Sequence, residues 1–251
     1  LGTPAGSKEE CNAFVDILTR KAAALFKSIH MMSSTHIKFL ILQKCISYCK
    51  MVYMMRTVPP DYIKGALGKF DLLIRDSAEK ILMTSFDSTS WEQATTSVRQ
   101  GGLGLRSSKR HRRAAYIASI ASAMNLVQET LKWKTDIANE AFIKKLLAEY
   151  NASVAEQDRL PDIKAARASV QRLLSQAIDK EHLKLLLATS STNAKARLNS
   201  LAMPHASSWL ACTPNRALGF YLNNMEFRNL ILFRLGLPLY EKDEPCHFCG
   251  R

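Results

Sequence analysis

Apolar side chains recur every three or four residues along almost the whole chain, and this spacing is what most constrains its fold. Near the start, Phe14, Leu18 and Ala22 fall on one side of a helix. Ser7 followed by Glu10 has the spacing of a capping box, in which each side chain bonds to the backbone N–H of the other residue. The alternation of apolar and polar residues that is typical of strands is almost absent. The sequence therefore predicts an all-α fold.

The most apolar stretch is predicted to form one helix that runs from about Thr35 to Met55. Lys38, Lys44 and Lys50 interrupt it, and each would cost about 2.5–3.5 kcal/mol at the centre of a membrane-spanning helix. We therefore expect a buried core helix whose lysines reach the solvent, and no membrane as partner. These lysines either form a solvated edge or follow the phosphates of a bound nucleic acid.

The rest of the chain shows the same helical pattern with few interruptions. Further helices are expected over about residues 62–82, in a short turn from Trp91, and over 114–133, 140–157, 161–189 and 223–237. Residues 203–222 contain two prolines and no clear period, which favours an irregular segment. We divide the chain into residues 1–90, 91–202 and 203–251. Because it begins without methionine and both ends look cut, we expect a piece of a larger protein.

Positive charge is in large excess. The chain has 35 basic and 22 acidic residues, a formal charge of +13, which favours a polyanionic partner, with nucleic acid ahead of an anionic membrane surface. The excess is densest between residues 93 and 128, where six basic residues occur without any Asp or Glu. This stretch includes the sequence GGLGLRSSKRHRR. A nucleic-acid contact is therefore expected in this part of the chain.

The glycine-rich start of this stretch does not have the spacing of a nucleotide-binding P-loop, and no strand precedes it. Glycines would let the backbone approach a polyanion, and Ser107 or Ser108 would cap the following helix, whose N–H groups could then meet a phosphate. The alternative is a solvated basic turn between two helices. The predicted nucleic-acid-binding residues are Arg99, Gly101, Gly102, Arg106, Lys109, Arg110, Arg112 and Arg113.

Cysteine spacing suggests one metal site and no catalytic one. Cys246 and Cys249, followed by a glycine, have the spacing of the first half of a tetrahedral zinc site. The alternative is two unrelated thiols. Cys212 and His205 are candidates for further ligands or for a nucleophile and its base, but unpaired structural thiols are much commoner. We expect no catalytic residue and no tight zinc binding by this chain alone.

Several short motifs occur in an order that resembles a known family. The chain opens with LGTPAGS, followed by YMMRTVPP at 53–60 and KFDLLI at 69–74. Then come GGLGLRS at 101–107 with AAYIAS after it, and FRNLILFRLGLPLY before CHFCG at the end. This ordered series resembles the reverse transcriptases of non-LTR retrotransposons, of the type that carries a zinc motif and a restriction-like endonuclease behind the polymerase.

The resemblance implies the region from the end of the palm, through thumb and linker, to the start of the zinc motif. A helical thumb bundle would then precede a helical linker domain and an irregular C-terminal segment. Thumb helices of this family grip the template–primer duplex through its backbone, so RNA, DNA or an RNA–DNA duplex is the implied partner, together with the remainder of the parent polyprotein. The alternative is a helical protein-interaction scaffold whose basic surface only aids solubility.

The resemblance also places the chemistry elsewhere. The aspartates that hold magnesium for nucleotidyl transfer would lie before Leu1, so this chain alone is not expected to be an enzyme, whereas its parent would be an RNA-directed DNA polymerase. The remaining zinc ligands would lie beyond Arg251, which makes zinc a cofactor of the full-length protein only. The implied location is intracellular, in the nucleus for the parent protein.

Overall fold

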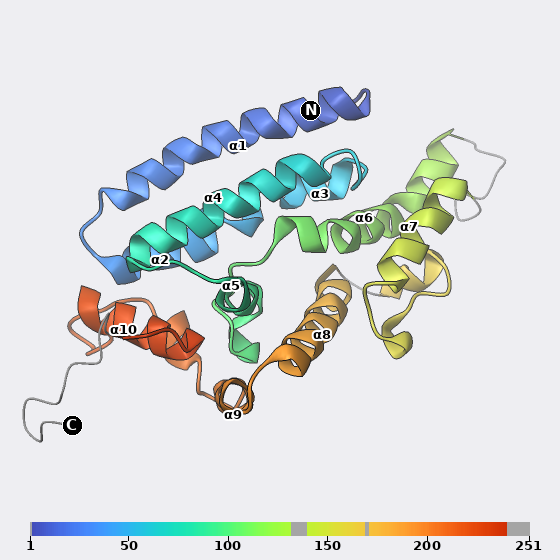
Figure 1. The fold of residues 1–251 in the computed structure, drawn as a ribbon. Helices are drawn as coiled ribbons and strands as arrows, with labels where there is room; N and C mark the ends of the chain where they lie inside the picture. The colour runs from blue at the N-terminus through green and yellow to red at the C-terminus, as the bar shows by residue number, and fades with distance from the viewer. Residues whose placement is uncertain (1, 132–139, 169–170, 240–251) are drawn as a thin grey trace, which may run out of the picture.

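The computed structural model describes residues 2–131, 140–168 and 171–239, and these form an all-α fold (Figure 1). Within these ranges there is no strand, and β pairing is limited to one isolated bridge between Asn215 and Phe220. The α-helices are α1 (Lys8–His30), α2 (Thr35–Ile41), α3 (Val52–Thr57), α4 (Lys64–Leu82), α5 (Ser88–Thr95), α6 (Ser108–Leu131), α7 (Ala141–Asn151), α8 (Gln171–Thr189), α9 (Thr192–Leu201) and α10 (Asn224–Leu235). The predicted fold class is confirmed.

Helices α1 and α4 lie side by side over a first hydrophobic core (Figure 1). The Ser7 hydroxyl accepts a bond from the Glu10 N–H, and the Glu10 carboxylate accepts one from the Ser7 N–H, so the predicted capping box fixes the start of α1. Val15, Phe39 and Phe70 are fully buried beneath these helices. The core residues of α1 and α4 repeat at helical spacing, which is why the sequence pattern located both helices.

The predicted helix from Thr35 to Met55 is wrong in one respect, because the chain breaks it into four pieces. After α2 come a π-helical turn, η1 (Leu42–Ile46), a 3₁₀ turn, η2 (Tyr48–Lys50), and α3. At the break, the Ser47 hydroxyl donates to the Gln43 carbonyl over 2.9 Å and competes with the helical hydrogen bonds. The break leaves Lys44 and Lys50 exposed, as expected for lysines that reach the solvent.

A second hydrophobic core lies between α6, α7, α8 and the 3₁₀ turn η6 (Lys164–Ala168). Helix α6 serves both cores, since Ala115 belongs to the first and Ile117 to the second. The predicted helix over 161–189 is shorter than expected, because α8 begins only at Gln171, after η6. In the part of the chain that the structure describes, no helix is long and apolar enough to cross a bilayer.

The C-terminal segment returns to the first core. Its stretch before α10 consists of turns, the 3₁₀ turn η7 (Ser208–Ala211) and the isolated bridge, so the predicted irregular character is confirmed there. Phe227 of α10 is fully buried, with its ring stacked on His36 at a centroid distance of 4.5 Å and edge-on to Trp209 at 6.0 Å. The three segments predicted from sequence therefore share two cores.

Candidate nucleic-acid interface

The glycine turn between α5 and α6 is folded tightly back on α5. Gly101 has a φ of 88°, a left-handed conformation that favours glycine. Gly102 has no room for a side chain, because a Cβ atom there would lie 2.5 Å from the Gln93 carbonyl oxygen and closer still to Thr96. The N–H groups of both glycines donate to carbonyls of η3 (Val98–Gln100) and of the residue before it. Both predicted contact glycines are buried, and they shape the turn.

The turn is held from behind by Arg234 of α10, whose side chain is buried. Its Nε donates to the Gly102 carbonyl over 3.1 Å, and its Nη2 donates to the Val98 carbonyl over 2.7 Å and to the Ser207 hydroxyl over 2.8 Å. No carboxylate pairs with this guanidinium among the described residues, and its Nη1 has no hydrogen-bond partner there. Burial lowers the pKa of Arg234 to about 10.

The N-terminus of α6 already holds an anion supplied by the chain. The Asp71 carboxylate on α4 accepts from the Ser107 hydroxyl over 2.6 Å, from the Ser108 N–H over 2.8 Å and from the Lys109 N–H over 3.1 Å. Burial raises the pKa of Asp71, against these hydrogen bonds, which lower it. The expectation that these N–H groups meet a phosphate does not fit this geometry, because Asp71 occupies the position.

Most arginines of the basic stretch are also used within the molecule. Arg106 Nη2 lies 2.6 Å from an oxygen of the buried Asp179 on α8. Arg113 Nη2 lies 2.6 Å from Glu149 on α7 and 3.5 Å from Asp61. Each pair joins α6 or the turn before it to a segment that is distant in the sequence. These two predicted contact residues therefore connect helices.

The other two arginines of α6's first turns are similarly placed. Arg110 pairs with Glu92 of α5 and donates to the Thr95 hydroxyl over 2.9 Å. Arg112 is buried and donates to the Pro60 carbonyl over 3.1 Å, and burial lowers its pKa. Of the predicted basic contact residues, Arg99 and Lys109 are exposed, whereas the four arginines from 106 to 113 are partly or fully buried.

A buried histidine accompanies these pairs. His111 is fully buried, its Nε2 lies 3.1 Å from Asp179 Oδ1, and the Tyr48 ring meets it edge-on at 5.8 Å. Burial lowers the pKa of His111 and outweighs the Asp179 carboxylate, which raises it. Burial acts to raise the pKa of Asp179, but His111 and Arg106 lower it below its ordinary value. Burial therefore favours the neutral form of the His111 imidazole, whereas the contacts of Asp179 favour its anion.

Arg99 opens onto a pocket of about 550 Å³, here named the basic pocket. Lys44 of η1 and His205 also line it, and none of its lining residues is acidic. His205 has a φ of 66°, which is strained for a residue with a side chain. Val98 and Ser207, the two residues that bind Arg234 Nη2, line the pocket as well. Lys44, Arg99 and His205 thus line a pocket without acidic residues, and Arg234 lies behind two of its lining residues.

Each of the three residues Lys44, Arg99 and His205 is a candidate from the sequence, but for a different reason. Lys44 was considered as a phosphate contact, Arg99 was predicted as one, and His205 was weighed only as a metal ligand or base. Nothing in the spacing of residues 44, 99 and 205 shows that they meet. Lys109 lies apart from this pocket, since its aliphatic chain runs beside Gly68 on α4.

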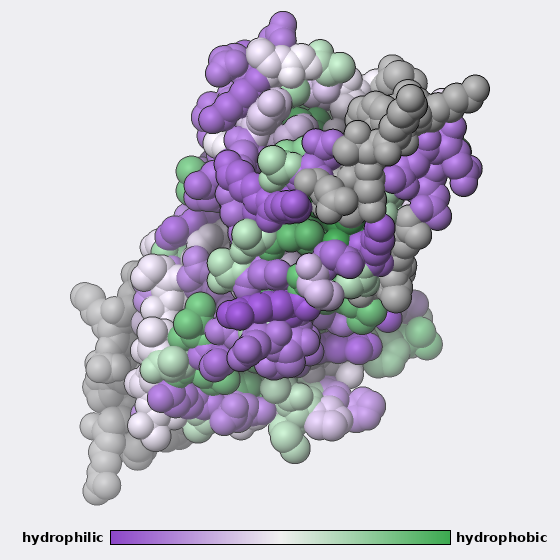
Figure 2. Space-filling model, turned by 90° about the vertical axis from the view of Figure 1, so that its right-hand side faces the viewer, coloured by the Kyte–Doolittle hydropathy of each residue, from purple (hydrophilic) through white to green (hydrophobic). Residues whose placement is uncertain are grey.

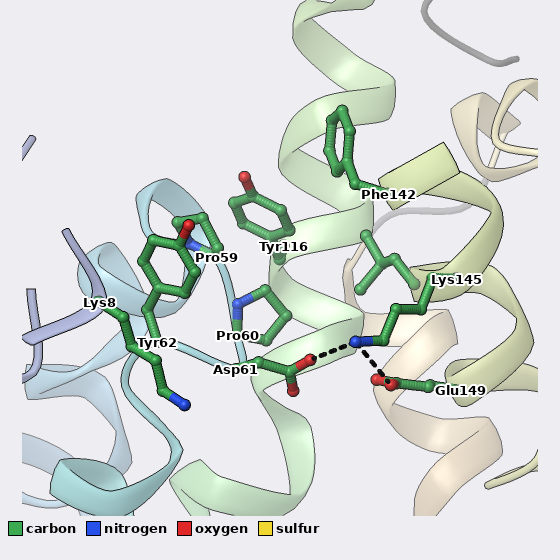
Figure 3. Close-up of a pocket in the computed structure, with 10 residues that line it drawn as sticks. Lys8, Pro59, Pro60, Asp61, Tyr62, Tyr116, Phe142, Lys145 and Glu149 are labelled. Carbon is green, nitrogen blue, oxygen red and sulfur yellow. Dashed lines mark ion pairs between the residues drawn. The ribbon is translucent and has the colours of Figure 1, made fainter. Parts of the chain in front are cut away.

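A second hollow, of about 540 Å³, lies where the two cores meet (Figure 3). Pro60 and Tyr62, from the segment between α3 and α4, form one wall, and Phe142 of α7 lies opposite. Tyr116 of α6 projects between them. Lys145 lies at one end, paired with Asp61 and with Glu149 (Figure 3). The sequence analysis did not predict this site, because its aromatic residues come from three separate parts of the chain: the segment between α3 and α4, α6, and α7.

The predicted half zinc site, Cys246 and Cys249, lies outside the described residues. Among the described residues there is no group of three or more His, Cys, Asp or Glu side chains that could hold a metal ion. Cys212 is a free thiol that donates to the Ser208 carbonyl over 3.4 Å. The structure thus brings Cys212 into contact with backbone, and the described residues offer no zinc ligand set.

Comparisons with known proteins give no relative for this chain. No protein-family model, no curated protein and no solved structure matches it.

Gly102→Ala should destabilise the protein by about 1–3 kcal/mol, because the added methyl group overlaps backbone atoms of the packed turn. Gly68→Ala is the matched control. Its Cβ would meet only Lys109 Cδ at 3.7 Å, so the free energy of unfolding should rise by about 0.5–1 kcal/mol, as expected for alanine inside a helix. Urea unfolding of both variants checks this. Equal stability of Gly102→Ala and the unmodified protein would contradict the packing of the turn.

The stability of the protein should fall as the pH is lowered from about 7 to 5. The unfolded state, with a histidine pKa of about 6.5, binds the proton more readily than buried His111, whose pKa is lowered, so acid favours unfolding. His111→Gln should make the slope shallower by up to about 1.4 kcal/mol per pH unit. Urea unfolding at several pH values measures it, and His205→Gln, on the exposed loop, is the control. An unchanged slope in His111→Gln would mean that folding leaves the pKa of His111 unchanged, which would contradict the prediction.

Proposed function

We propose that this helical segment binds nucleic acid through its phosphates, at the basic pocket. The observation that carries the proposal is the convergence of Lys44, Arg99 and His205 on a hollow of about 550 Å³ with no acidic residue in its lining. The Lys44 and Arg99 cations, which converge there without a carboxylate, attract a polyanion, whose negative charge would balance theirs. Lysine and arginine contacts of this kind bind the backbone and leave the base sequence unread.

The buried charge of Arg234 supports the same ligand. Among the described residues, its guanidinium contacts carbonyl and hydroxyl oxygens and no carboxylate. Two of these contacts, Val98 and Ser207, form part of the pocket lining. A cation in a low-dielectric interior favours an anion nearby, because solvent screens it poorly. A phosphate in the pocket would therefore interact with the exposed cations and with the field of Arg234.

The ion pairs of the arginines leave the excess positive charge to other residues. Arg106, Arg110 and Arg113 pair with Asp179, Glu92 and Glu149, respectively. These pairs carry no net charge, whereas Lys44, Lys50 and Arg99 are exposed. The exposed part of the molecule thus keeps the excess of cations that makes up the net charge of +13.

The resemblance to non-LTR retrotransposon reverse transcriptases makes this proposal more specific. In it, the chain is the thumb and linker that hold RNA, DNA or an RNA–DNA template–primer duplex for the remainder of the parent polyprotein. The chain itself would be no enzyme. Magnesium-dependent polymerisation would belong to the palm, zinc to the motif that begins at Cys246 and Cys249, and the parent protein would act in the nucleus.

The test is binding of a fluorescent RNA–DNA duplex, followed by anisotropy from low to moderate salt. The double variant Lys44→Ala/Arg99→Ala should bind about tenfold more weakly at low salt, and its dependence of log affinity on log salt should be shallower by about two contacts. These two side chains are exposed, so the variant should fold. Substituting the paired arginines of α6 would instead confound binding with stability.

Arg20→Ala/Lys21→Ala is the matched control. Both residues are exposed on α1, and neither lines the basic pocket. If both double variants lost the same amount of affinity, the binding would result from the general positive charge of the protein and not from the basic pocket. The scaffold alternative would be favoured if neither the variants nor the unmodified protein bound the duplex, and if the protein bound a protein partner independently of salt.

A further inference from the structure

The hollow at the junction of the two cores, which Figure 3 shows, shares lining residues with two neighbouring hollows, and the three together are named here the aromatic groove. One neighbour, of about 400 Å³, shares Tyr62 with it and adds Lys64. The other, of about 340 Å³, shares Tyr116 and Phe142 and adds Arg56. Tyr62 and Phe142 stay 36% and 53% exposed, so their ring faces are open to a ligand.

The groove is held in shape from both sides. The segment Pro59–Tyr62 leads directly into Ile63 at the start of α4, which is fully buried in the first core. Phe142 precedes Ile143, which is fully buried in the second core. Arg112, bonded to the Pro60 carbonyl, and Arg113, bonded to Glu149, connect both walls to α6. The aromatic side chains therefore project from anchored backbone.

The charges around the groove favour an anionic ligand. Asp61 and Glu149, which line it, are both paired: Asp61 with Arg112, Arg113 and Lys145, and Glu149 with Arg113 and Lys145. The groove's other lining cations are Lys8, Arg56 and Lys64, none of which has a carboxylate partner among the described residues, and its remaining acid is the exposed Glu9. Lys8, Arg56 and Lys64 thus lie beside aromatic rings, and two of the three acids of the groove, Asp61 and Glu149, are paired.

Exposed aromatic faces beside free cations are the combination that binds single-stranded nucleic acid, with bases stacked on the rings and phosphates on the cations. We propose that the aromatic groove stacks unpaired nucleobases of a single strand on the exposed rings of Tyr62 and Phe142, with the flanking phosphates on Lys8, Arg56 and Lys64. This inference rests on the proposed nucleic-acid function. It adds a site for a single strand to the basic pocket, which is proposed to bind a duplex.

The competing occupant is a proline-rich peptide, since such peptides also bind aromatic grooves. The cations favour the nucleic acid, because a proline-rich peptide carries no charge for Lys8, Arg56 and Lys64 to neutralise. The two occupants differ in a property that can be measured: single-strand binding should depend on salt as well as on the rings.

The experiment is a titration of the whole chain into a single-stranded RNA with 2-aminopurine at one central position. Stacking on a tyrosine or phenylalanine ring should quench the probe. Tyr62→Ala and Phe142→Ala should each lower the affinity about tenfold, the effect expected for the loss of one base–aromatic stack, and should abolish the quench. Phe142→Tyr, which keeps a ring, should restore both. Phe233→Ala, which removes an exposed ring on α10 outside the groove, should change neither.

The same variants and the variant Lys44→Ala/Arg99→Ala are also tested on the RNA–DNA duplex. Loss of single-strand binding in Phe142→Ala with unchanged duplex binding confirms the groove. The groove proposal is overturned if both alanine variants bind the single strand normally. It is also overturned if they lose binding only to a proline-rich peptide probe. Neither result bears on the basic pocket. Uncharged adenosine, followed by ligand-detected NMR, tests the groove alone: binding that Phe142→Ala abolishes supports it even where the duplex proposal fails, and no binding counts against it.

Discussion

The buried guanidinium of Arg234 joins three parts of the molecule that are far apart in the sequence, and the arrangement around it depends on its being buried. Its three hydrogen bonds bind the glycine turn, η3 and the segment before η7 to α10. Gln93 of α5 completes the junction, since its amide donates to the carbonyls of both Gly101 and Arg234 over 2.9 Å. A buried cation without a carboxylate is costly, and the lowered pKa of Arg234 reflects that cost. The carbonyls of Val98 and Gly102 offset part of this cost, and their bonds to Arg234 hold the turn on which Arg99 lies beside the basic pocket.

The basic stretch shows why clustered charge in a sequence is not the same as a charged surface. Four of its arginines contact carboxylates on four different segments, and Asp71 completes α6 at its N-terminus. Partly buried pairs of this kind give little net stability by themselves, because both partners lose hydration. They are specific, however, since a guanidinium without its carboxylate would remain buried and uncompensated. The stretch thus selects how α6 sits against α4, α5, α7 and α8.

Local signals in the sequence predicted most of the helices, although not α9, together with the capping box of Ser7 and Glu10 and the irregular segment before α10, because each depends on residues a few positions apart. The break near Ser47 was missed, since it involves a side-chain bond that competes with a well-formed helical pattern. The pairing of Asp71 with Ser108 and of Asp179 with Arg106 spans 37 and 73 residues. Periodicity carries no information on such distances, so the arginines were predicted as ligand contacts while their true partners stayed unassigned. Arg99 was identified, but its grouping with Lys44 and His205 is a property of the tertiary fold.

The two candidate sites are linked through α6. The helix begins where Asp71 fixes it to α4, next to the glycine turn that positions Arg99. One turn later, Arg112 and Arg113 reach Asp61 and Glu149 and neutralise the acids of the aromatic groove. The basic stretch therefore sets the electrostatics of both sites while exposing little of its own charge: at one end it supports the cationic turn, and at the other it removes negative charge from the groove. A nucleic acid that contacts both sites would meet positive potential produced by side chains that it never touches, which is possible because partly buried charges are only weakly screened by solvent.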